Sequence, residues 1–365
     1  MTKRVVVWGT GNVGRPALRA VLAHRELELA GVVVASEAKV GRDAGELAGT
    51  QPVGVRATAD GAALLARGDV DAVVYAATAD TRPKEAYADL IACLRAGANV
   101  VSTAFYPLLY PKTAPPELMQ LVDAACRAGH SSVFVSGIDP GWALDVLPLL
   151  LSGVVADLRE VRCQEIFDYG LYDQPDVVRN VIGFGRPLDA LPLMLHDFSL
   201  RMVWEPMVRL LGDGLRRPVD RVETHVERRP LERALEVPGM GRFEAGTQGA
   251  FRFEVRGLSE GEPLFVVEHV TRIDGACAPD WPYPPEGRGC HRVILRGTPV
   301  LHVTVHGEDP YEPGPAGGGN ATAANRIVNA IPAVCAAAPG VRTPLDLPPM
   351  TGAAQWASNR NRNGS

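Results

Sequence analysis

A glycine-rich segment near the N-terminus combines residue types and a spacing that suit phosphate binding. Its six residues are Gly9, Thr10, Gly11, Asn12, Val13 and Gly14, in the pattern GxGxxG. The segment lies between an apolar run at 4–8 and a helical pattern at 15–23, the context in which this pattern binds a dinucleotide. Gly9 permits a tight turn, Gly11 lets the backbone approach a pyrophosphate, and Gly14 lets the helix pack closely on the strand. We expect this loop to bind NAD(P).

The residues after the second apolar run indicate which dinucleotide is bound. They lie about 20 positions beyond the glycines, where the adenosine ribose binds. No Asp stands there, and the sequence has Ser36 and Glu37, followed by Lys39 and Arg42. A hydroxyl followed by cations suits a 2′-phosphate, so Ser36, Lys39 and Arg42 predict NADP. Glu37 would instead accept a hydrogen bond from the 2′-OH of NAD, and a solvated charged loop explains the two cations equally well.

Other residues are expected to border the cofactor because ligands of doubly wound sheets bind beyond the carboxyl ends of the strands. After the apolar runs at 71–76 and 99–103, these residues are Ala76, Ala77, Thr78, Thr103, Ala104 and Phe105. Asn329 lies four residues after Asn325 in the last helical pattern. It is a candidate for binding the cofactor amide, and a polar helix face is the alternative.

Hydride transfer to a C=O or C=N carbon also requires a group that protonates the product oxygen or nitrogen. Glu165 shares a face of the apolar run 160–167 with Val161 and Cys163. Burial there is expected to raise its pKa and make it a general acid, and a strand-edge glutamate paired with an arginine is the equal alternative. The catalytic candidates are Glu165, Tyr169, Asp139 and His306, the last because a Gly-rich stretch follows it.

Large side chains near these candidates predict an apolar substrate pocket. Its predicted wall residues are Tyr106, Trp142, Phe167 and Tyr172. For Trp142, packing between domains is an equal alternative. The substrate is therefore expected to be small to medium-sized and mostly apolar.

No metal site is expected. His302 and His306 are four residues apart on one strand pattern, which separates them by ~13 Å. Glu268 and His269 raise the same acid–base question as Glu165. They are strand neighbours that point to opposite faces, so only one of them can reach a given site. The six cysteines are scattered without a CxxC pair, which indicates reduced thiols and neither a disulfide framework nor a zinc site.

The elements that must position these residues follow two different rhythms. Over the first 140 residues, unbroken Val/Ala/Ile runs alternate with helical patterns, which predicts a Rossmann domain with a doubly wound parallel sheet. Beyond residue 155 the strand patterns come in hairpins, which predicts an α+β domain with a largely antiparallel open sheet. A Gly/Pro loop at 310–319 then precedes a final helix at 320–338.

These rhythms predict an α/β chain with four segments. Residues 1–145 form the dinucleotide-binding Rossmann domain, and residues 146–319 form the α+β domain for substrate binding and dimerisation. Residues 320–350 form a C-terminal helix that packs back on the first domain, and 351–365 form a tail. An open sheet face is typically covered by a partner, so we expect a homodimer.

Composition excludes several functional classes. The chain has 365 residues and a net charge of −5, so it lacks the basic character of a nucleic-acid-binding protein. No run of 18 apolar residues predicts a membrane span. The first residues enter a strand at once and leave no room for a signal peptide, so a cytoplasmic enzyme is expected.

Longer segments resemble known families. Residues 41–49 and the following Gly54-Val55 resemble dihydrodipicolinate reductases, although the substrate-site signature of those enzymes is absent. Residues 7–14, 136–141 and 325–340 together resemble the 2,4-diaminopentanoate dehydrogenase-like family, which includes the native amine dehydrogenases. The resemblance implies a two-domain, usually dimeric, NAD(P)-dependent oxidoreductase. Its members move hydride between nicotinamide and a C=N or C=O carbon, in the reductive amination of a carbonyl substrate with ammonia or the reverse.

One departure from that family matters for the chemistry. In the amine dehydrogenases a glutamate just after the strand that corresponds to 99–103 handles ammonia, whereas residues 102–110 of this chain contain no carboxylate. Either Glu165 or Asp139 replaces that glutamate, or the enzyme reduces a carbonyl or imine without ammonia. The alternative of another class is a non-catalytic NAD(P)-binding sensor or scaffold protein.

Overall fold

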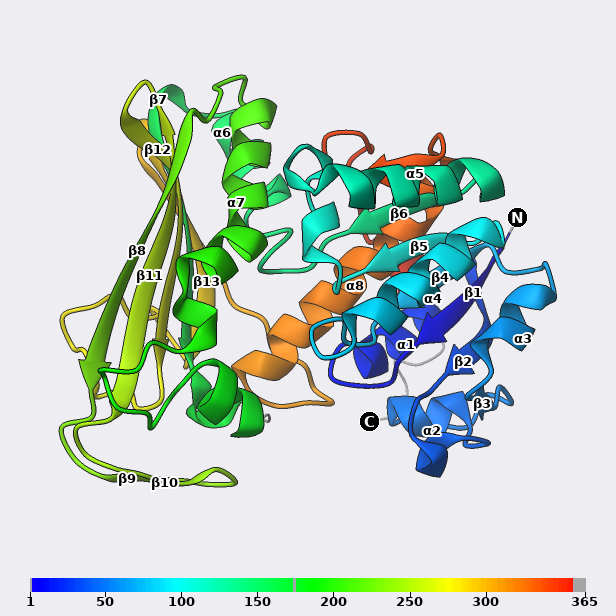
Figure 1. The fold of residues 1–365 in the computed structure, drawn as a ribbon, viewed down its shortest axis with the longest axis horizontal. Helices are drawn as coiled ribbons and strands as arrows, with labels where there is room; N and C mark the ends of the chain where they lie inside the picture. The colour runs from blue at the N-terminus through cyan, green and yellow to red at the C-terminus, as the bar shows by residue number, and fades with distance from the viewer. Residues whose placement is uncertain (1, 173–174, 357–365) are drawn as a thin grey trace. The chain divides into compact units, whose positions relative to one another are not determined.

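A seven-stranded, entirely parallel sheet forms the centre of the first part of the chain (Figure 1). Its strands are β1 (Lys3–Trp8), β2 (Leu27–Val33), β3 (Ala57–Thr58), β4 (Ala72–Tyr75), β5 (Asn99–Ser102), β6 (Ser132–Val135) and β15 (Gly340–Arg342). Their order is β15-β6-β5-β4-β1-β2-β3, so the direction of winding reverses between β1 and β4. This reversal is the hallmark of a Rossmann fold and confirms the predicted doubly wound sheet.

The helices around this sheet are α1 (Gly14–Ala23), α2 (Ala44–Ala48), α3 (Gly61–Ala66), α4 (Pro83–Arg95), α5 (Pro116–Gly129) and part of α8 (Pro315–Ala336). Val5 of β1, Leu18 of α1 and Leu47 of α2 share one buried cluster with Ile327 and Ile331 of α8. The C-terminal segment therefore completes the core that the N-terminal strands begin.

The computed structural model describes residues 2–172 and 175–356, which divide into two units. The first unit contains the residues up to Gly137 and those from Asn320 onward, and the second contains Ile138–Gly319. The boundary lies ahead of the predicted one at 145/146. Asp139 and Trp142 consequently belong to the second unit. No helix in the described ranges is both long and apolar enough to span a membrane.

The last helix differs from the prediction at its start. It begins at Pro315, so the stretch assigned to a Gly/Pro loop is partly helical. A Cβ on Gly317 would lie 1.7 Å from the carbonyl oxygen of Glu312, and one on Gly318 would lie 1.9 Å from that of Gly307. The glycines therefore let the first helical turn pack directly on the preceding loop backbone.

The predicted tail also begins with structured residues. Gln355 Nε2 donates hydrogen bonds to the carbonyl oxygen of Ala20 at 3.1 Å and to Asn329 Oδ1 at 3.2 Å. Backbone and side-chain contacts thus hold this segment on the first unit. Residues 357–365 of the predicted tail lie outside the described residues.

A six-stranded sheet forms the second unit (Figure 1). Its strands are β7 (Ala156–Asp168), β8 (Arg221–Pro230), β11 (Gln248–Ser259), β12 (Glu262–Arg272), β13 (Gly289–Thr298) and β14 (Leu301–Val305), in the order β14-β13-β7-β12-β11-β8. Every neighbouring pair is antiparallel except β7 with β12, which run parallel. The predicted α+β architecture with a largely antiparallel sheet is confirmed.

Smaller elements complete the second unit. They are α6 (Val146–Ser152), α7 (Asp197–Gly214) and the hairpin of β9 (Leu235–Val237) with β10 (Gly241–Phe243). The second unit also has two short 3-10 segments, η4 (Tyr169–Leu171) and η6 (Leu193–Leu195), and the π-helical η5 (Val177–Val181). The 3-10 segments of the first unit are η1 (Glu37–Lys39), η2 (Tyr106–Leu108), η3 (Pro111–Thr113) and η7 (Ala353–Gln355). Helix α7 packs against β11 and β12, where its Trp204 ring contacts Phe253 and His269.

The opposite face of this sheet carries a network of charged side chains. Glu268 is only 1% exposed and accepts hydrogen bonds from Arg162 at 2.5 Å, Gln164 at 2.9 Å and Arg252 at 2.8 Å. Glu254 also accepts hydrogen bonds from Arg162 and Arg252. Neighbouring side chains of β12 point to opposite faces of the sheet. Because Glu268 lies in this network, His269 points to the face on which α7 packs.

Candidate active site

The GxGxxG loop has the backbone geometry of a phosphate-binding turn. Gly9 has φ +102°, and a Cβ there would lie 2.7 Å from the backbone nitrogen of Ala77. A Cβ on Gly14 would lie 2.1 Å from the carbonyl oxygen of Gly9, so only glycine lets α1 start this close to β1. Apart from Gly11 and its two neighbours in the chain, no atom of the described residues lies within 4 Å of the place that a Cβ on Gly11 would take. This open space fits the pyrophosphate of NAD(P).

The predicted 2′-phosphate residues do not all contact this loop. Lys39 in η1 donates from Nζ to the carbonyl oxygen and to Oγ1 of Thr10, both at 3.1 Å. Ser36 and Arg42 are exposed near the same end of β2. Of the two predicted cations, Lys39 is thus the one with a contact to the glycine-rich loop in the described part of the chain.

The candidates after β4 and β5 have mixed environments. Ala76 donates from its backbone to the carbonyl oxygen of Trp8 at 2.8 Å, which places the segment Ala76, Ala77 and Thr78 beside the glycine-rich loop. Thr103 and Ala104 are half-buried after β5, as is Tyr106 at the start of η2. Phe105, by contrast, is fully buried, with its ring 5.1 Å from those of Tyr75 and Tyr87. Its ring therefore packs in the core of the first unit.

Asn329 lies on α8 in the first unit, where its Oδ1 accepts the hydrogen bond from Gln355 described above. Part of its hydrogen-bonding capacity is therefore used within the chain.

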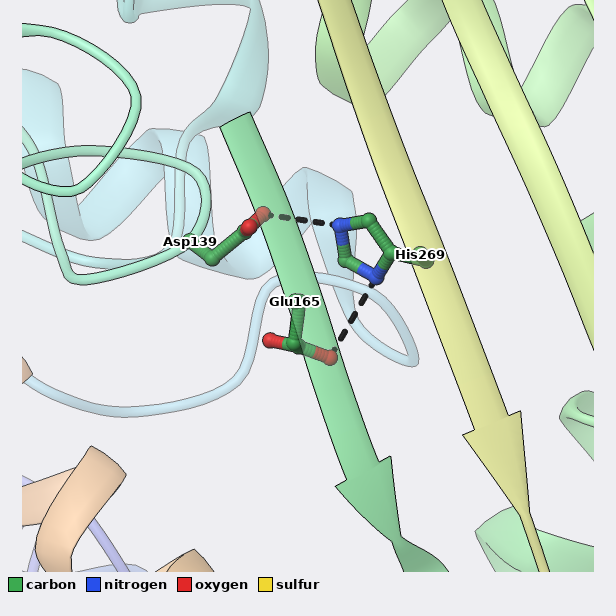
Figure 2. Close-up of side chains that lie close together, drawn as sticks. All are labelled: Asp139, Glu165 and His269. Carbon is green, nitrogen blue, oxygen red and sulfur yellow. Dashed lines mark hydrogen bonds and ion pairs between the residues drawn. The ribbon is translucent and has the colours of Figure 1, made fainter. Parts of the chain in front are cut away.

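Two carboxylates flank one imidazole in the second unit, and we call these three side chains the acid–imidazole cluster (Figure 2). His269 Nε2 lies 3.1 Å from Asp139 Oδ1, and His269 Nδ1 lies 3.3 Å from Glu165 Oε1. The exposed fractions of the side chains are 0% for Asp139, 6% for His269 and 12% for Glu165. The cluster joins two predicted catalytic residues through a histidine that was not among the candidates.

Strand register brings these residues together. Glu165 on β7 lies opposite His269 on the parallel strand β12 and opposite His291 on the antiparallel strand β13. Directly opposed residues on one sheet face have Cβ atoms about 5 Å apart, within reach of side-chain hydrogen bonds. Glu165 Oε2 lies 3.5 Å from His291 Nε2. The glutamate is therefore placed between two imidazoles.

This arrangement overturns the predicted protonation of Glu165. Burial alone would raise the pKa of Glu165, but His269 and His291 outweigh that effect and hold the pKa well below its usual range. Burial alone would lower the pKa of His269, but Asp139 and Glu165 raise it to about 10. The proton of the cluster therefore lies on His269, which is an imidazolium at neutral pH.

Aromatic rings enclose the imidazolium. Phe253 stacks on His269 with ring centroids 4.5 Å apart at 15°, and Trp204 meets it edge-on at 4.8 Å. Trp204 Nε1 also donates a hydrogen bond to Asp139 Oδ1 at 2.8 Å. The rings exclude water on these sides, which strengthens the charge interactions within the cluster.

The other predicted residues of this unit lie in different environments. Tyr169 lies 3.4 Å from Glu165 Oε1 through its hydroxyl and stacks on Tyr172, with centroids 4.9 Å apart. Burial, with Glu165 and Tyr172 nearby, raises the pKa of Tyr169 well above its usual value. Phe167 packs on His291 at 5.2 Å. Trp142 is half-buried, whereas His306 is exposed and next to Gly287, outside the cluster.

Tyr172 also lines a cavity of about 380 Å³ at the end of β7. Leu235, Val237, Met240 and Ile273 supply apolar parts of its wall. Arg288, which forms an ion pair with Asp168, also lines it. Tyr172 thus lines a cavity with apolar parts, and its role in binding substrate stays a prediction.

The acid–imidazole cluster also has the donor atoms that a metal site would need. The three ligand atoms lie within 4.8 Å of one another. A metal ion would have to displace a proton from His269, because both ring nitrogens of an imidazolium carry hydrogens.

Comparison with known proteins decides the family. Residues 3–106 match the family described as dihydrodipicolinate reductase, N-terminus. Over 345 residues the chain is 52% identical to an amine dehydrogenase of Streptomyces virginiae, which covers 94% of this chain and 95% of that protein. The chain belongs to the amine dehydrogenase family. The resemblance seen in the sequence and the predicted class, an NAD(P)-dependent oxidoreductase, are both confirmed.

More distant relatives match the chain over nearly its whole length. A 2,4-diaminopentanoate dehydrogenase of Acetoanaerobium sticklandii is 23% identical over 94% of this chain and 93% of its own. The structure of an amine dehydrogenase from Mycobacterium smegmatis superposes with a TM-score of 0.74 at 23% identity, covering 98% of this chain and 99% of the other. The fold of this chain is thus shared with an amine dehydrogenase of low sequence identity.

Proposed function

We propose that this enzyme catalyses the reductive amination of a small to medium-sized, mostly apolar ketone or aldehyde, or the reverse reaction. In the forward direction one carbonyl compound, one ammonium ion and NAD(P)H give one primary amine, one water and NAD(P)⁺. The observation that carries the proposal is the buried acid–imidazole cluster in a member of the amine dehydrogenase family. Two carboxylates and one imidazolium leave a net negative charge, which attracts an ammonium ion or a protonated amine.

The bound cofactor would supply the hydride that reduces the C=N carbon. Gly9, Gly11 and Gly14 would hold its pyrophosphate, and the open space at Gly11 supports this assignment. NADP is the proposed form because Lys39 is fixed against Thr10 of the loop, where a 2′-phosphate would gain a charge-assisted contact.

The residues of the cluster would handle the protons of the reaction. Ammonium would lose a proton to a solvent base at alkaline pH, so that the free nitrogen can attack the carbonyl carbon and form a carbinolamine. The His269 imidazolium then donates a proton to the hydroxyl group as the C–O bond breaks, and water leaves. Glu165 and Asp139 keep His269 charged at the alkaline pH at which free ammonia is abundant. These carboxylates would replace the glutamate that is missing after β5.

The apolar surroundings support the proposed substrate class. Phe167 and Tyr169 lie on or next to the cluster, and Tyr172 joins them to the cavity at the end of β7. Tyr106 and Trp142 remain proposed pocket residues.

Consumption of NADPH with a panel of ketones and aldehydes, with and without excess ammonium, tests the proposal. Oxidation that requires ammonium supports it. Oxidation that ignores ammonium would show a carbonyl or imine reductase, and NADPH binding without oxidation across the panel would favour a sensor. The homodimer and the cytoplasmic location also stay predictions. Sedimentation that shows only monomer at micromolar concentration would contradict the dimer.

A further inference from the structure

The two carboxylate oxygens of Asp139 have different environments. Oδ1 accepts the indole N–H of Trp204 at 2.8 Å and lies 3.1 Å from His269 Nε2. Oδ2 is buried and has no hydrogen-bond partner in the described ranges 2–172 and 175–356. A buried carboxylate oxygen without a donor is costly, because it has lost its water without gaining a replacement. Such an atom is expected to meet a donor that a ligand supplies.

The charge of the acid–imidazole cluster determines which kind of donor is favoured. Asp139 and Glu165 are both acceptors, and His269 already directs one ring nitrogen to each of them. A donor that brings positive charge offsets the remaining negative charge, whereas a neutral hydroxyl or an anion does not. An N–H of ammonium or of a protonated primary amine has the required charge and geometry.

We propose that Asp139 Oδ2 is the binding atom for the nitrogen of ammonium or of the primary amine, and that Trp204 is the positioning residue that keeps Oδ2 free for it. This inference rests on the proposed function. The indole of Trp204 holds Oδ1, its ring packs on Phe253 at 4.7 Å, and α7 fixes its backbone. The carboxylate is therefore locked in one rotation, with Oδ1 turned to the protein and Oδ2 turned away from its partners.

The Trp204→Phe variant removes the indole N–H and keeps an aromatic ring. Without that donor the carboxylate can turn, so the KM for ammonium is expected to rise roughly tenfold, the effect of one charge-assisted hydrogen bond. The KM for the carbonyl substrate and the affinity for NADPH should stay within about twofold. Asp139→Asn should raise the KM for ammonium further, by roughly a hundredfold.

Trp281→Phe is the matched control. Trp281 is a buried tryptophan of the same unit that packs with Ile166, Val270 and Cys277 in a separate apolar cluster. The Trp281→Phe substitution should leave the KM for ammonium unchanged. Equal changes in the KM for ammonium and the KM for the carbonyl compound in Trp204→Phe, or the same shift in Trp281→Phe, would overturn the inference, since either result indicates a general packing effect.

A binding measurement separates this inference from the proposed function. The Tm of the NADP-bound enzyme is compared in ammonium chloride and in sodium chloride of equal ionic strength. Ammonium should raise the Tm of the wild type and of Trp281→Phe, but not that of Asp139→Asn. If the wild type turns over without ammonium yet shows this selective stabilisation, the nitrogen site stands and the proposed reaction fails. Equal Tm values in the two salts would refute the nitrogen site itself.

Discussion

Glu165 lies directly opposite His269 across the parallel pair of β7 and β12, with its Oε1 3.3 Å from the ring Nδ1. The register of these two strands therefore places Glu165 beside His269. This contact favours the charged forms of both side chains, with the proton on His269. A shift of one residue would turn His269 to the opposite sheet face and place Glu268 beside Glu165. The charged network of Glu268 on that other face stabilises the register that the chemistry needs.

Replacing Glu165 by Gln should lower kcat by about 10²–10⁴-fold, the range expected when an acid–base group is lost. The amide keeps the shape of the side chain but no longer holds His269 in its charged form. The affinity for NADPH, measured by fluorescence titration, should not change. Wild-type turnover in this variant would remove Glu165 from the mechanism.

The free energy of unfolding should depend on pH through the titration of both His269 and Glu165. Because the pKa of His269 is raised to about 10, its stabilising contribution is complete below its ordinary value of 6.5 and is lost as the pH rises towards 10. Because the pKa of Glu165 is lowered, its contribution is present above 4.5 and is lost as the pH falls below that value.

Urea unfolding from pH 4 to 10 measures these contributions. Asp139→Asn, which removes one partner of His269, should lose less stability than the wild type between about pH 7 and 10. Parallel curves for the two proteins would show that Asp139 does not control the charge of His269.

Substitution of Glu268 by Ala should destabilise the enzyme by about 3–5 kcal/mol, because it leaves Arg162 and Arg252 with unbalanced, partly buried charge. Glu244→Ala is the control, since Glu244 and its partner Arg242 are about two-thirds exposed and should change the free energy of unfolding little. Similar losses in both variants, measured by urea unfolding, would argue against a special role for the Glu268 network.

The glycines of the dinucleotide loop should respond differently to Ala. Gly14→Ala forces a Cβ to within 2.1 Å of Gly9 O and should destabilise the first unit strongly. Gly11→Ala meets no described atom within 4 Å and should leave the Tm of the free enzyme unchanged. The added methyl should instead raise the Kd for NADPH by at least ~10-fold, because it occupies the space for the pyrophosphate. Unaltered NADPH binding in Gly11→Ala would contradict the assigned cofactor position.

Lys39→Ala should raise the KM for NADPH by roughly tenfold and leave the KM for NADH nearly unchanged, since only NADPH carries the 2′-phosphate. Lys84→Ala, which removes an exposed lysine of the same unit, is the control. Equal effects on both cofactors would show that Lys39 supports the loop through Thr10 without distinguishing the cofactors.

The sequence predicted the parallel sheet well because unbroken apolar runs and well-spaced glycines are local signals. It missed β3, α2, α3 and β15, whose lengths of two to six residues are too short for periodicity to be visible. The extension of α8 to Pro315 was missed for a different reason. Its glycines are typical of a loop, but in the structure they let the backbone of the first helical turn lie against the backbone of the preceding loop.

The active-site prediction failed where it depended on pairing between distant strands. Asp139 and Glu165 were identified from their positions in the chain, but the charge on Glu165 depends on His269 and His291, which are more than one hundred residues away. Alternation along the strand showed that only one of Glu268 and His269 could reach the site. A signal to choose between them existed in the four arginines at 162, 252, 256 and 272, which suggest a charged opposite face.

The chain makes its dinucleotide-binding unit from both of its ends, and this affects the order in which a ribosome delivers the parts. Strands β1 to β6 emerge first, then the whole second unit, and only afterwards most of α8 and the edge strand β15. Until that point Val5 and Leu18 lack the cover of Ile327 and Ile331. A nascent chain can therefore assemble its acid–imidazole cluster while the cofactor-binding core is still unfinished.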